Sequence, residues 1–168
     1  MNRPQDEHDV DAPGRSDETT VSAVLTAAAV THEIVTMRGY ARTAAEAAEG
    51  LGVPVSSIVK SLVCVADGSP VVALVPGDRD LSFVKLATLA GAGEVRLASR
   101  RLVEKTSGYP VGGVAPVGLP ADLPVFGDSV ILSADVVFCG AGSDRHMLRV
   151  ASRDLARHVS VTWGEICA

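Results

Sequence analysis

The chain has 168 residues, of which 47% are hydrophobic, and a formal net charge of −5 at pH 7. This length and apolar content suffice for one hydrophobic core, so we expect a single folded domain. Aromatic residues make up only 4% of the chain, which argues against an RNA-binding sheet that stacks bases on aromatic rows. The sequence shows neither a membrane-length apolar run nor the pattern of a signal peptide, and we therefore expect a cytoplasmic protein.

The negative charge is concentrated near the N-terminus. Residues 1–18 contain six acidic residues, two arginines and almost no apolar side chains. We therefore expect residues 1–19 to form a disordered acidic tail and residues 20–168 to form the folded domain. The part after residue 18 holds 14 of the 20 acidic and 13 of the 15 basic residues. Such a nearly neutral domain lacks the strongly basic surface of proteins that grip a long nucleic acid.

The first elements alternate helix and strand patterns. Thr20 is predicted to cap a helix over residues 21–30, which a short strand at 33–37 follows. Thr43 and Glu46 have the spacing of a capping box, so a second helix is expected to begin there.

A β-hairpin with an unusual lysine follows. Two apolar runs, residues 58–66 and 70–78, flank the turn signal Asp67-Gly68. Lys60 lies within the first run, although lysine is almost never fully buried unless a partner pairs with it. The residues that share its face of the strand are Ile58, Leu62 and Cys64. Either the ammonium reaches the strand edge, or this face borders a polar cavity.

The next segments lead into a stretch rich in glycine and proline. The pattern predicts a helix over residues 81–91, a brief strand over 94–98 and a helix capped by Ser99. Residues 108–118, "GYPVGGVAPVG", are expected to form neither helix nor ordinary strand. Such loops expose backbone N–H groups to a ligand, since glycine has no Cβ, but the loop is equally compatible with a structural connector.

The C-terminal part returns to strands. We expect strands within residues 123–128, 130–142 and 146–151, a helix over 152–159 and a last short segment around Val161. Hairpins mixed with short helices favour an α+β or mixed-sheet domain over a doubly wound one. The cysteines Cys64, Cys139 and Cys167 lack the spacing of a zinc site. We expect reduced thiols, with the first two packed as small core residues.

The order of four segments resembles the YbaK/prolyl-tRNA synthetase-associated editing domain family. These segments are "VKSLV", "ALVPGDRDL", "TSGYPVGGVAPVG" and "LPVFGD". The similarity extends from about residue 21 to about residue 155. Its most specific part is residues 112–118, which match the family's G-x-x-x-P loop and the glycine after it. That loop by itself would be a weak match, but it follows the strand lysine at the family's distance with "VPGD" between them.

The resemblance implies a fold and an activity. The fold would be a single α+β domain with a mixed, largely antiparallel sheet flanked by short helices, holding no metal and no cofactor. The activity would be hydrolysis, in trans, of the ester between a wrong amino acid and the 3′ ribose of a tRNA. Cysteinyl-tRNA for proline is the expected substrate, because the similarity is greatest to the free-standing YbaK branch, whereas sister branches edit alanyl and seryl or threonyl esters. The expected partners are the acceptor end of the tRNA and, for tRNA selection, prolyl-tRNA synthetase or an elongation factor.

By position, the resemblance also implies the site residues. The catalytic set would be Lys60, Gly112, Gly113 and Pro116, and the substrate-binding set Val114, Ala115, Gly118 and Asp128. Lys60 is expected to anchor the terminal phosphate or ribose, and the loop 112–116 to hold the aminoacyl group. Asp128 is expected to orient the substrate's amino group, with the start of a turn as its alternative role. His146 departs from a glycine-rich run of many relatives, and Tyr40, Arg42 and Thr43 are expected near the pocket mouth.

The chemistry fits these parts. An aminoacyl ester is already activated, so the protein mainly needs to orient a nucleophile and hold the developing oxyanion. In the branch that edits cysteinyl-tRNA, the substrate's own thiol is the nucleophile, which agrees with the lack of a convincing Ser/His/Asp or Cys/His set here. Two alternatives stay open: a non-catalytic relative that binds a small amino-acid-like or nucleotide ligand, and an interaction module with the acidic tail as its contact arm.

Overall fold

The computed structural model describes residues 16–168, so most of the predicted acidic tail lies outside the described residues. Its first element is helix α1, Glu18–Ala27, and Asp17 rather than Thr20 caps it. The Asp17 carboxylate accepts hydrogen bonds from the backbone N–H groups of Thr19 and Thr20, and the Thr20 hydroxyl accepts one from Asp17 N. The predicted cap was wrong by three residues, because an aspartate that belongs to a capping box was assigned to the tail.

Most of the predicted elements are present. The helices are α1 Glu18–Ala27, α2 Ala44–Leu51, α3 Phe83–Ala90, α4 Arg100–Ser107 and α5 Ser152–His158, with two 3₁₀ turns, η1 Val55–Ser57 and η2 Ser129–Ser133. The strands are β1 His32–Thr36, β2 Ile58–Ala66, β3 Ser69–Pro76, β4 Val95–Leu97, β5 Val125–Asp128, β6 Val136–Gly140, β7 His146–Ala151 and β8 Val161–Gly164. The Thr43 capping box and the Ser99 cap are confirmed.

The strand predicted over residues 130–142 needs a correction. Residues 129–133 form η2, and the strand begins only at Val136. Asp128 accepts a hydrogen bond from Val130 N at 3.1 Å, and the Ser133 hydroxyl donates to the Val130 carbonyl at 2.6 Å. These local side-chain bonds satisfy backbone groups that a strand would pair with a neighbour, so the segment turns instead.

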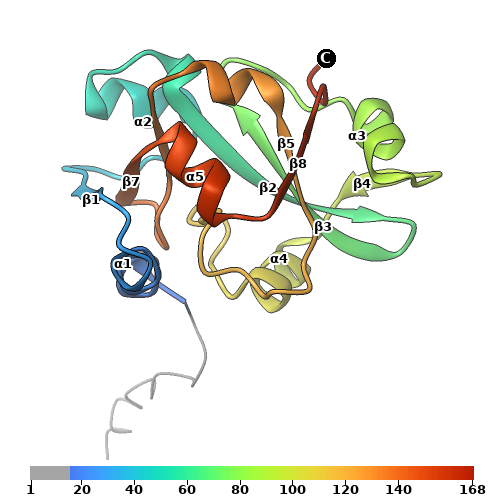
Figure 1. The fold of residues 1–168 in the computed structure, drawn as a ribbon, viewed down its shortest axis with the longest axis horizontal. Helices are drawn as coiled ribbons and strands as arrows, with labels where there is room; N and C mark the ends of the chain where they lie inside the picture. The colour runs from blue at the N-terminus through green and yellow to red at the C-terminus, as the bar shows by residue number, and fades with distance from the viewer. Residues whose placement is uncertain (1–15) are drawn as a thin grey trace, which may run out of the picture.

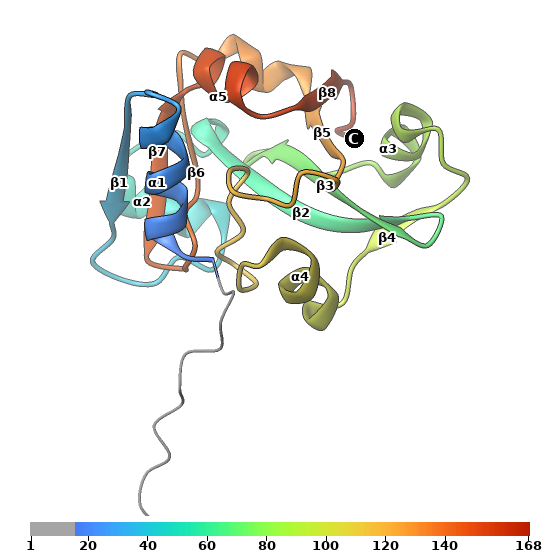
Figure 2. The same cartoon turned by 60° about the horizontal axis from the view of Figure 1, so that its bottom comes forward.

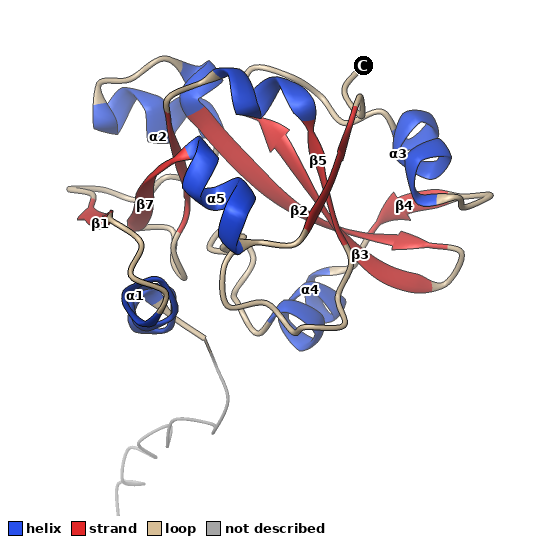
Figure 3. Ribbon diagram, viewed as in Figure 1, coloured by secondary structure: helices blue, strands red, loops and turns tan. Residues whose placement is uncertain are grey.

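All the strands of residues 16–168 join one mixed sheet. The sheet has eight strands in the order β1-β7-β6-β2-β3-β5-β8, with β4 pairing with β2 beside this path. The pairs β1–β7, β6–β7, β2–β3 and β2–β4 are antiparallel, and β2–β6, β3–β5 and β5–β8 are parallel. Figures 1 and 3 show the long β2–β3 hairpin at the centre and the helices around the sheet. The predicted α+β fold is confirmed.

The hairpin also supplies the centre of the core. Val59, Val63, Val72 and Leu74 pack in the main hydrophobic cluster, to which α1, α4 and α5 contribute. The opposite face of the hairpin packs in a second cluster that includes Cys64 and residues of α3. Figure 2 shows α4 and α3 on different sides of the hairpin. Full burial of each such aliphatic side chain contributes about 1.5–3 kcal/mol, which fixes the position of β2 in the sheet.

One edge of β2 is only partly paired. On the side away from β3, β6 pairs with Ile58 and Val59, and β4 pairs with residues 64–66. Between these two neighbours the described chain places no strand beside β2. This gap in the sheet positions the candidate site. Among the described helices, none has the length and apolar character that a membrane crossing requires.

Candidate functional site

A cavity of about 630 Å³ opens at the gap beside β2. Its lining residues are 41–45, Ala47, 58–63, Gly77, 97–98, Val103, Val111, Gly112, Val114, Gly140, Ser143, Asp144 and Met147. Residues 58–63 are consecutive, whereas the side chains of a strand point alternately to its two faces. The cavity therefore meets β2 along its backbone edge rather than across one face.

Lys60 occupies the wall of this cavity. Its ammonium donates a hydrogen bond to the Arg79 carbonyl at 2.6 Å. Arg79 belongs to the turn that follows β3, and Gly77 N in that turn donates to the Ile58 carbonyl at 2.7 Å. The turn formed by residues 77–79 thus holds the lysine in place, and the ammonium retains further N–H groups for a ligand. The lysine borders a cavity, and its ammonium is paired with a backbone carbonyl.

The glycine-rich loop also contributes to the cavity lining. As predicted, residues 108–118 form neither helix nor strand. Gly112 lines the cavity with φ of 87°, a left-handed conformation that favours glycine, and its missing Cβ would meet open space. Gly113 instead lies against the loop after β6, where a Cβ would come within 2.6 Å of Ser143 N. The Gly113 carbonyl accepts a hydrogen bond from Gly142 N at 2.8 Å, so the two loops are joined by their backbones.

Tyr109 holds the loop from within the core and was not identified from the sequence. The side chain is fully buried, and its hydroxyl donates to the Val117 carbonyl at 2.7 Å. Burial, together with the nearby Asp17 carboxylate, raises the pKa of Tyr109 to about 12, which keeps the hydroxyl protonated as a donor. An aromatic residue next to a glycine-rich loop is a weak signal, because an aromatic residue is equally common in any core.

Of the remaining predicted loop residues, one lines the cavity and the others lie outside its lining. Val114 lines the cavity, whereas Ala115 and Pro116 are buried in the loop and are not among its lining residues. Gly118 packs against the Tyr109 hydroxyl, where a Cβ would come within 2.6 Å. The cavity therefore brings together Lys60, Gly112 and Val114, and the other loop residues support them.

Asp128 is buried outside the cavity lining. One carboxylate oxygen accepts from Val130 N, which confirms the alternative role of starting a turn. The other accepts from Ile166 N at 3.0 Å and from Cys167 N at 2.9 Å, and so fastens the C-terminal segment. Burial opposes ionisation of this carboxyl, but the backbone N–H donors outweigh it, and the pKa of Asp128 is lowered.

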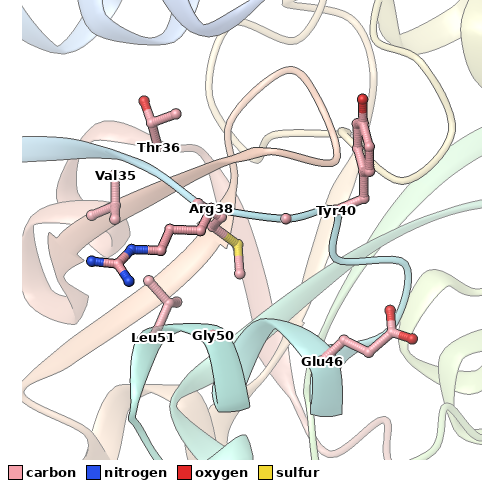
Figure 4. A pocket seen from close by; sticks show the side chains of 9 residues that line it. Val35, Thr36, Arg38, Tyr40, Glu46, Gly50 and Leu51 are labelled. Carbon is pink, nitrogen blue, oxygen red and sulfur yellow. The ribbon is translucent and has the colours of Figure 1, made fainter.

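Two of the three residues expected near the pocket mouth line the cavity. They are Arg42 and Thr43, whereas Tyr40 lines a second hollow of about 370 Å³. In Figure 4 the Tyr40 side chain points away from α2. The Arg145 guanidinium lies over the Tyr40 ring, 5.6 Å from its centroid. The Ala41 N–H donates to the Asp144 carbonyl at 2.8 Å, so the two loops that carry these side chains are tied together.

A hydroxyl–imidazole pair borders the cavity. Ser143 lines it, and its Oγ lies 2.6 Å from Nδ1 of His146. Glu18 Oε2 lies 4.0 Å from the same nitrogen. In a Ser-His-Asp triad the hydroxyl and the carboxylate contact opposite ring nitrogens. The geometry is therefore not that of a triad, and His146 instead holds Ser143 in the wall.

The cysteines are core residues. All three are free and buried. Burial raises the pKa of Cys64 to about 11 and that of Cys139 to about 12. Burial and the neighbouring Asp128 raise the pKa of Cys167 to about 12. None is activated as a nucleophile, since the thiolate is the reactive form. Among residues 16–168, no three His, Cys, Asp or Glu side chains gather as a metal site would require.

Several known proteins are similar to this chain in sequence and in fold. The family model "Aminoacyl-tRNA editing domain" matches residues 39–158. The proline–tRNA ligase of Nitratidesulfovibrio vulgaris (strain Hildenborough) is 41% identical over 144 residues, which cover 84% of this chain and 25% of the ligase. That of Solidesulfovibrio magneticus is 45% identical over 121 residues, which cover 71% of this chain and 20% of the ligase. The chain thus spans at most a quarter of the length of these relatives.

Two solved structures have nearly the same extent as this chain. The crystal structure of a hypothetical protein superposes with a TM-score of 0.83 at 33% identity, covering 89% of this chain and 99% of the other. A structure described as a candidate trans-editing enzyme for prolyl tRNA synthetase superposes with a TM-score of 0.81 at 28% identity, covering 94% of this chain and 99% of the other. From the family match, the ligase relatives and the shared fold, we conclude that this chain belongs to the aminoacyl-tRNA editing domain family.

Proposed function

We propose that this chain is a trans-editing deacylase, which hydrolyses the ester of a mischarged aminoacyl-tRNA, with cysteinyl-tRNA for proline as its substrate. One observation carries the proposal: a cavity at a gap in the sheet that both Lys60 and the glycine-rich loop at Gly112 line. The similarity to a free-standing trans-editing candidate over 94% of this chain supports action in trans.

Lys60 is proposed to bind the 3′ end of the tRNA. Its ammonium already donates to the Arg79 carbonyl, which aims the side chain while leaving other N–H groups for a phosphate or ribose oxygen. Hydrogen bonds from a charged donor to a phosphate are roughly twice as strong as neutral ones. Placing this charge at the cavity wall favours a ligand that brings negative charge to the same place.

The glycine-rich loop is proposed to hold the aminoacyl group. Gly112 lines the cavity in a left-handed conformation with open space where its Cβ would be, so a ligand can approach its backbone closely. The loop is rigid because the Tyr109 hydroxyl and the backbone of Gly142 hold its two sides. Fixed N–H donors of this kind stabilise a developing oxyanion without reorganisation.

The substrate's own thiol is the proposed nucleophile for a cysteinyl ester. The cavity lining includes no Cys, and the Ser143–His146 pair lacks the geometry of an activated triad. Intramolecular attack by the thiol on the ester carbonyl forms a C–S bond and breaks the bond to the ribose oxygen, which takes up the thiol's proton. Water then opens the resulting cyclic thioester to give free cysteine. A protein nucleophile is then unnecessary, and positioning supplies most of the acceleration.

Selection of the tRNA is proposed to depend on a partner such as prolyl-tRNA synthetase or an elongation factor. The part of the chain after residue 18 has 14 acidic and 13 basic residues, so it carries no net positive charge with which to bind a long duplex. A protein of this charge contacts the acceptor end and little else. Equal deacylation rates on cysteinyl esters of tRNAs of different identity, measured without a partner, are the expected result.

The decisive experiment measures release of labelled amino acid from cysteinyl-, alanyl- and seryl-tRNA for proline. The Lys60→Ala variant is compared with Lys105→Ala, which removes an exposed lysine of α4 outside the cavity lining. We expect fast release of cysteine, a loss of about 100-fold in Lys60→Ala from about 2–3 kcal/mol of lost charge-assisted bonding, and no loss in the control. Release of alanine or serine instead would reassign the substrate. No release from any ester would contradict the deacylase proposal and favour a ligand-binding relative.

A further inference from the structure

Ser61 lies on β2 where the strand borders the gap in the sheet. The Ile58 carbonyl accepts from Gly77 N at 2.7 Å, so even-numbered residues of β2 direct their backbone groups toward β3. The Val63 carbonyl accepts from Ala98 N at 3.0 Å, so odd-numbered residues direct theirs to the opposite edge. On that edge Val59 pairs with Cys139, and the described chain gives Ser61 no paired residue. The N–H and C=O of Ser61 therefore point into the gap.

The gap and the cavity are the same space. Residues 58–63 line the cavity consecutively, which requires the cavity to abut the strand edge at Ser61. Ser61 is partly exposed, and backbone groups that no strand satisfies are free to bond with water or with a ligand. A donor and an acceptor on one residue, aimed into a cavity, indicate a ligand that carries the complementary pair.

An aminoacyl ester carries that pair. Its α-ammonium donates and its ester carbonyl accepts, in the arrangement of the N–H and C=O of a single strand residue. We propose that the aminoacyl group binds as a one-residue addition to β2, with the ammonium donating to the Ser61 carbonyl and the ester carbonyl accepting from the Ser61 N–H. This inference rests on the proposed function for its substrate class, and it makes Ser61 a binding residue through its backbone.

The same arrangement places the amino-acid side chain. Residues paired directly across a ladder project their side chains from the same face of the sheet. The substrate side chain therefore lies on the face of Ser61, toward the cavity residues Val63, Val103 and Val114. On this face the Ser61 hydroxyl is buried without a hydrogen-bond partner among the described residues. This position accommodates a small substrate side chain, and a polar one can form a hydrogen bond with the Ser61 hydroxyl.

Substrate analogues on one tRNA test the pairing. Cysteinyl-tRNA is compared with 3-mercaptolactyl-tRNA, in which a hydroxyl replaces the ammonium, and with N-acetylcysteinyl-tRNA, both of which keep the thiol. Each rate is divided by the spontaneous hydrolysis rate of the same ester, because the ammonium also activates the ester chemically. We expect normalised kcat/KM to fall 10- to 100-fold for both analogues, as loss of one charge-assisted hydrogen bond predicts. Normalised rates within threefold of one another would overturn the proposal.

A binding experiment separates this inference from the catalytic proposal. The probe is an adenosine that carries alanine through an amide at its 3′ position, and the readout is hydrogen exchange of backbone amides followed by NMR. Saturating probe is expected to slow exchange of the Ser61 amide. The Val65 amide is the control, since it lies on the same edge of β2 but is already paired with Arg96. Slower exchange at Ser61 in a protein that releases no amino acid would support the binding mode and refute catalysis. Unchanged exchange at Ser61 would overturn the binding mode even in an active enzyme.

Discussion

Replacement of Asp128 by asparagine is expected to destabilise the domain by about 2–3 kcal/mol. The carboxylate accepts hydrogen bonds from Val130 N at 3.1 Å, Ile166 N at 3.0 Å and Cys167 N at 2.9 Å. An asparagine has one acceptor oxygen and one amide nitrogen, so either the turn or the C-terminal segment loses its acceptor. Asp128 is 3% exposed. Leaving a buried N–H donor without a partner costs about 1–3 kcal/mol, and the cost is higher when the lost partner was charged.

The assay is thermal and urea unfolding of the parent and of Asp128→Asn across pH 2.5–8. For a chain of this size, about 2–3 kcal/mol corresponds to a fall in Tm of roughly 4–12 °C near neutral pH. The sign of the pH dependence follows from the lowered pKa of Asp128 in the folded state. The carboxylate's contribution is complete above its unfolded pKa of about 4, and it decreases as the pH falls through the lower folded pKa. The difference between the two proteins is therefore expected to shrink at acid pH.

Two results would refute this reasoning. Equal stability of the two proteins at pH 7 would show that the three backbone bonds contribute nothing net. A constant difference from pH 8 to pH 2.5 would show that the charge of Asp128 is not what the backbone donors stabilise. In the folded variant, deacylation is measured at a temperature well below both unfolding midpoints, so that a change in kcat/KM reports on the cavity and not on stability.

Three further predictions concern the core and the loop. Tyr109→Phe leaves a buried carbonyl of the glycine-rich loop without its donor, and equilibrium unfolding in urea is expected to show a loss of about 1–2 kcal/mol. Gly113→Ala places a Cβ 2.6 Å from a backbone nitrogen, and we expect the free energy of unfolding to fall by about 2 kcal/mol or more. In the control Gly39→Ala the new Cβ meets nothing within 4 Å, so its stability should be unchanged. Equal losses in the two variants would contradict the packing argument. The three buried thiols should react with a thiol reagent at pH 8 only after denaturant is added, and fast labelling of the native protein would disprove their burial. Because their folded pKa values of about 11 and 12 lie above the unfolded value of roughly 8.5, stability is also expected to fall as the pH rises above that value.

The elements that the sequence predicted are those whose signals are local. The capping box at Thr43 and Glu46 lies within one helical turn, and the Asp67-Gly68 turn joins two strands that pair with each other. In each case the determining contacts involve residues a few positions apart. The sequence also identified Lys60 as anomalous, because a single strand's alternation suffices to place a lysine among apolar neighbours.

The predictions that failed involved competition between two local signals. Asp17 reads as one more acid of a charged tail, but its backbone and side chain form a capping box with Thr20. The apolar run after Asp128 reads as a strand, but the carboxylate bonds the backbone two residues later and starts a 3₁₀ turn. Apolar pattern cannot show which backbone groups a polar side chain will satisfy.

The candidate site itself depends on contacts between distant parts of the chain. By itself, the sequence determined that the domain would contain a strand lysine and a glycine-rich loop, and that the loop would follow the lysine along the chain. Only the tertiary structure decided that β6 and β4 flank β2 without meeting, and that the resulting gap exposes the backbone of Ser61 to the cavity that Gly112 also lines. The physical reason is that strand neighbours are selected by packing of the whole sheet, whereas side-chain alternation along β2 is the same whether its edge is paired or free.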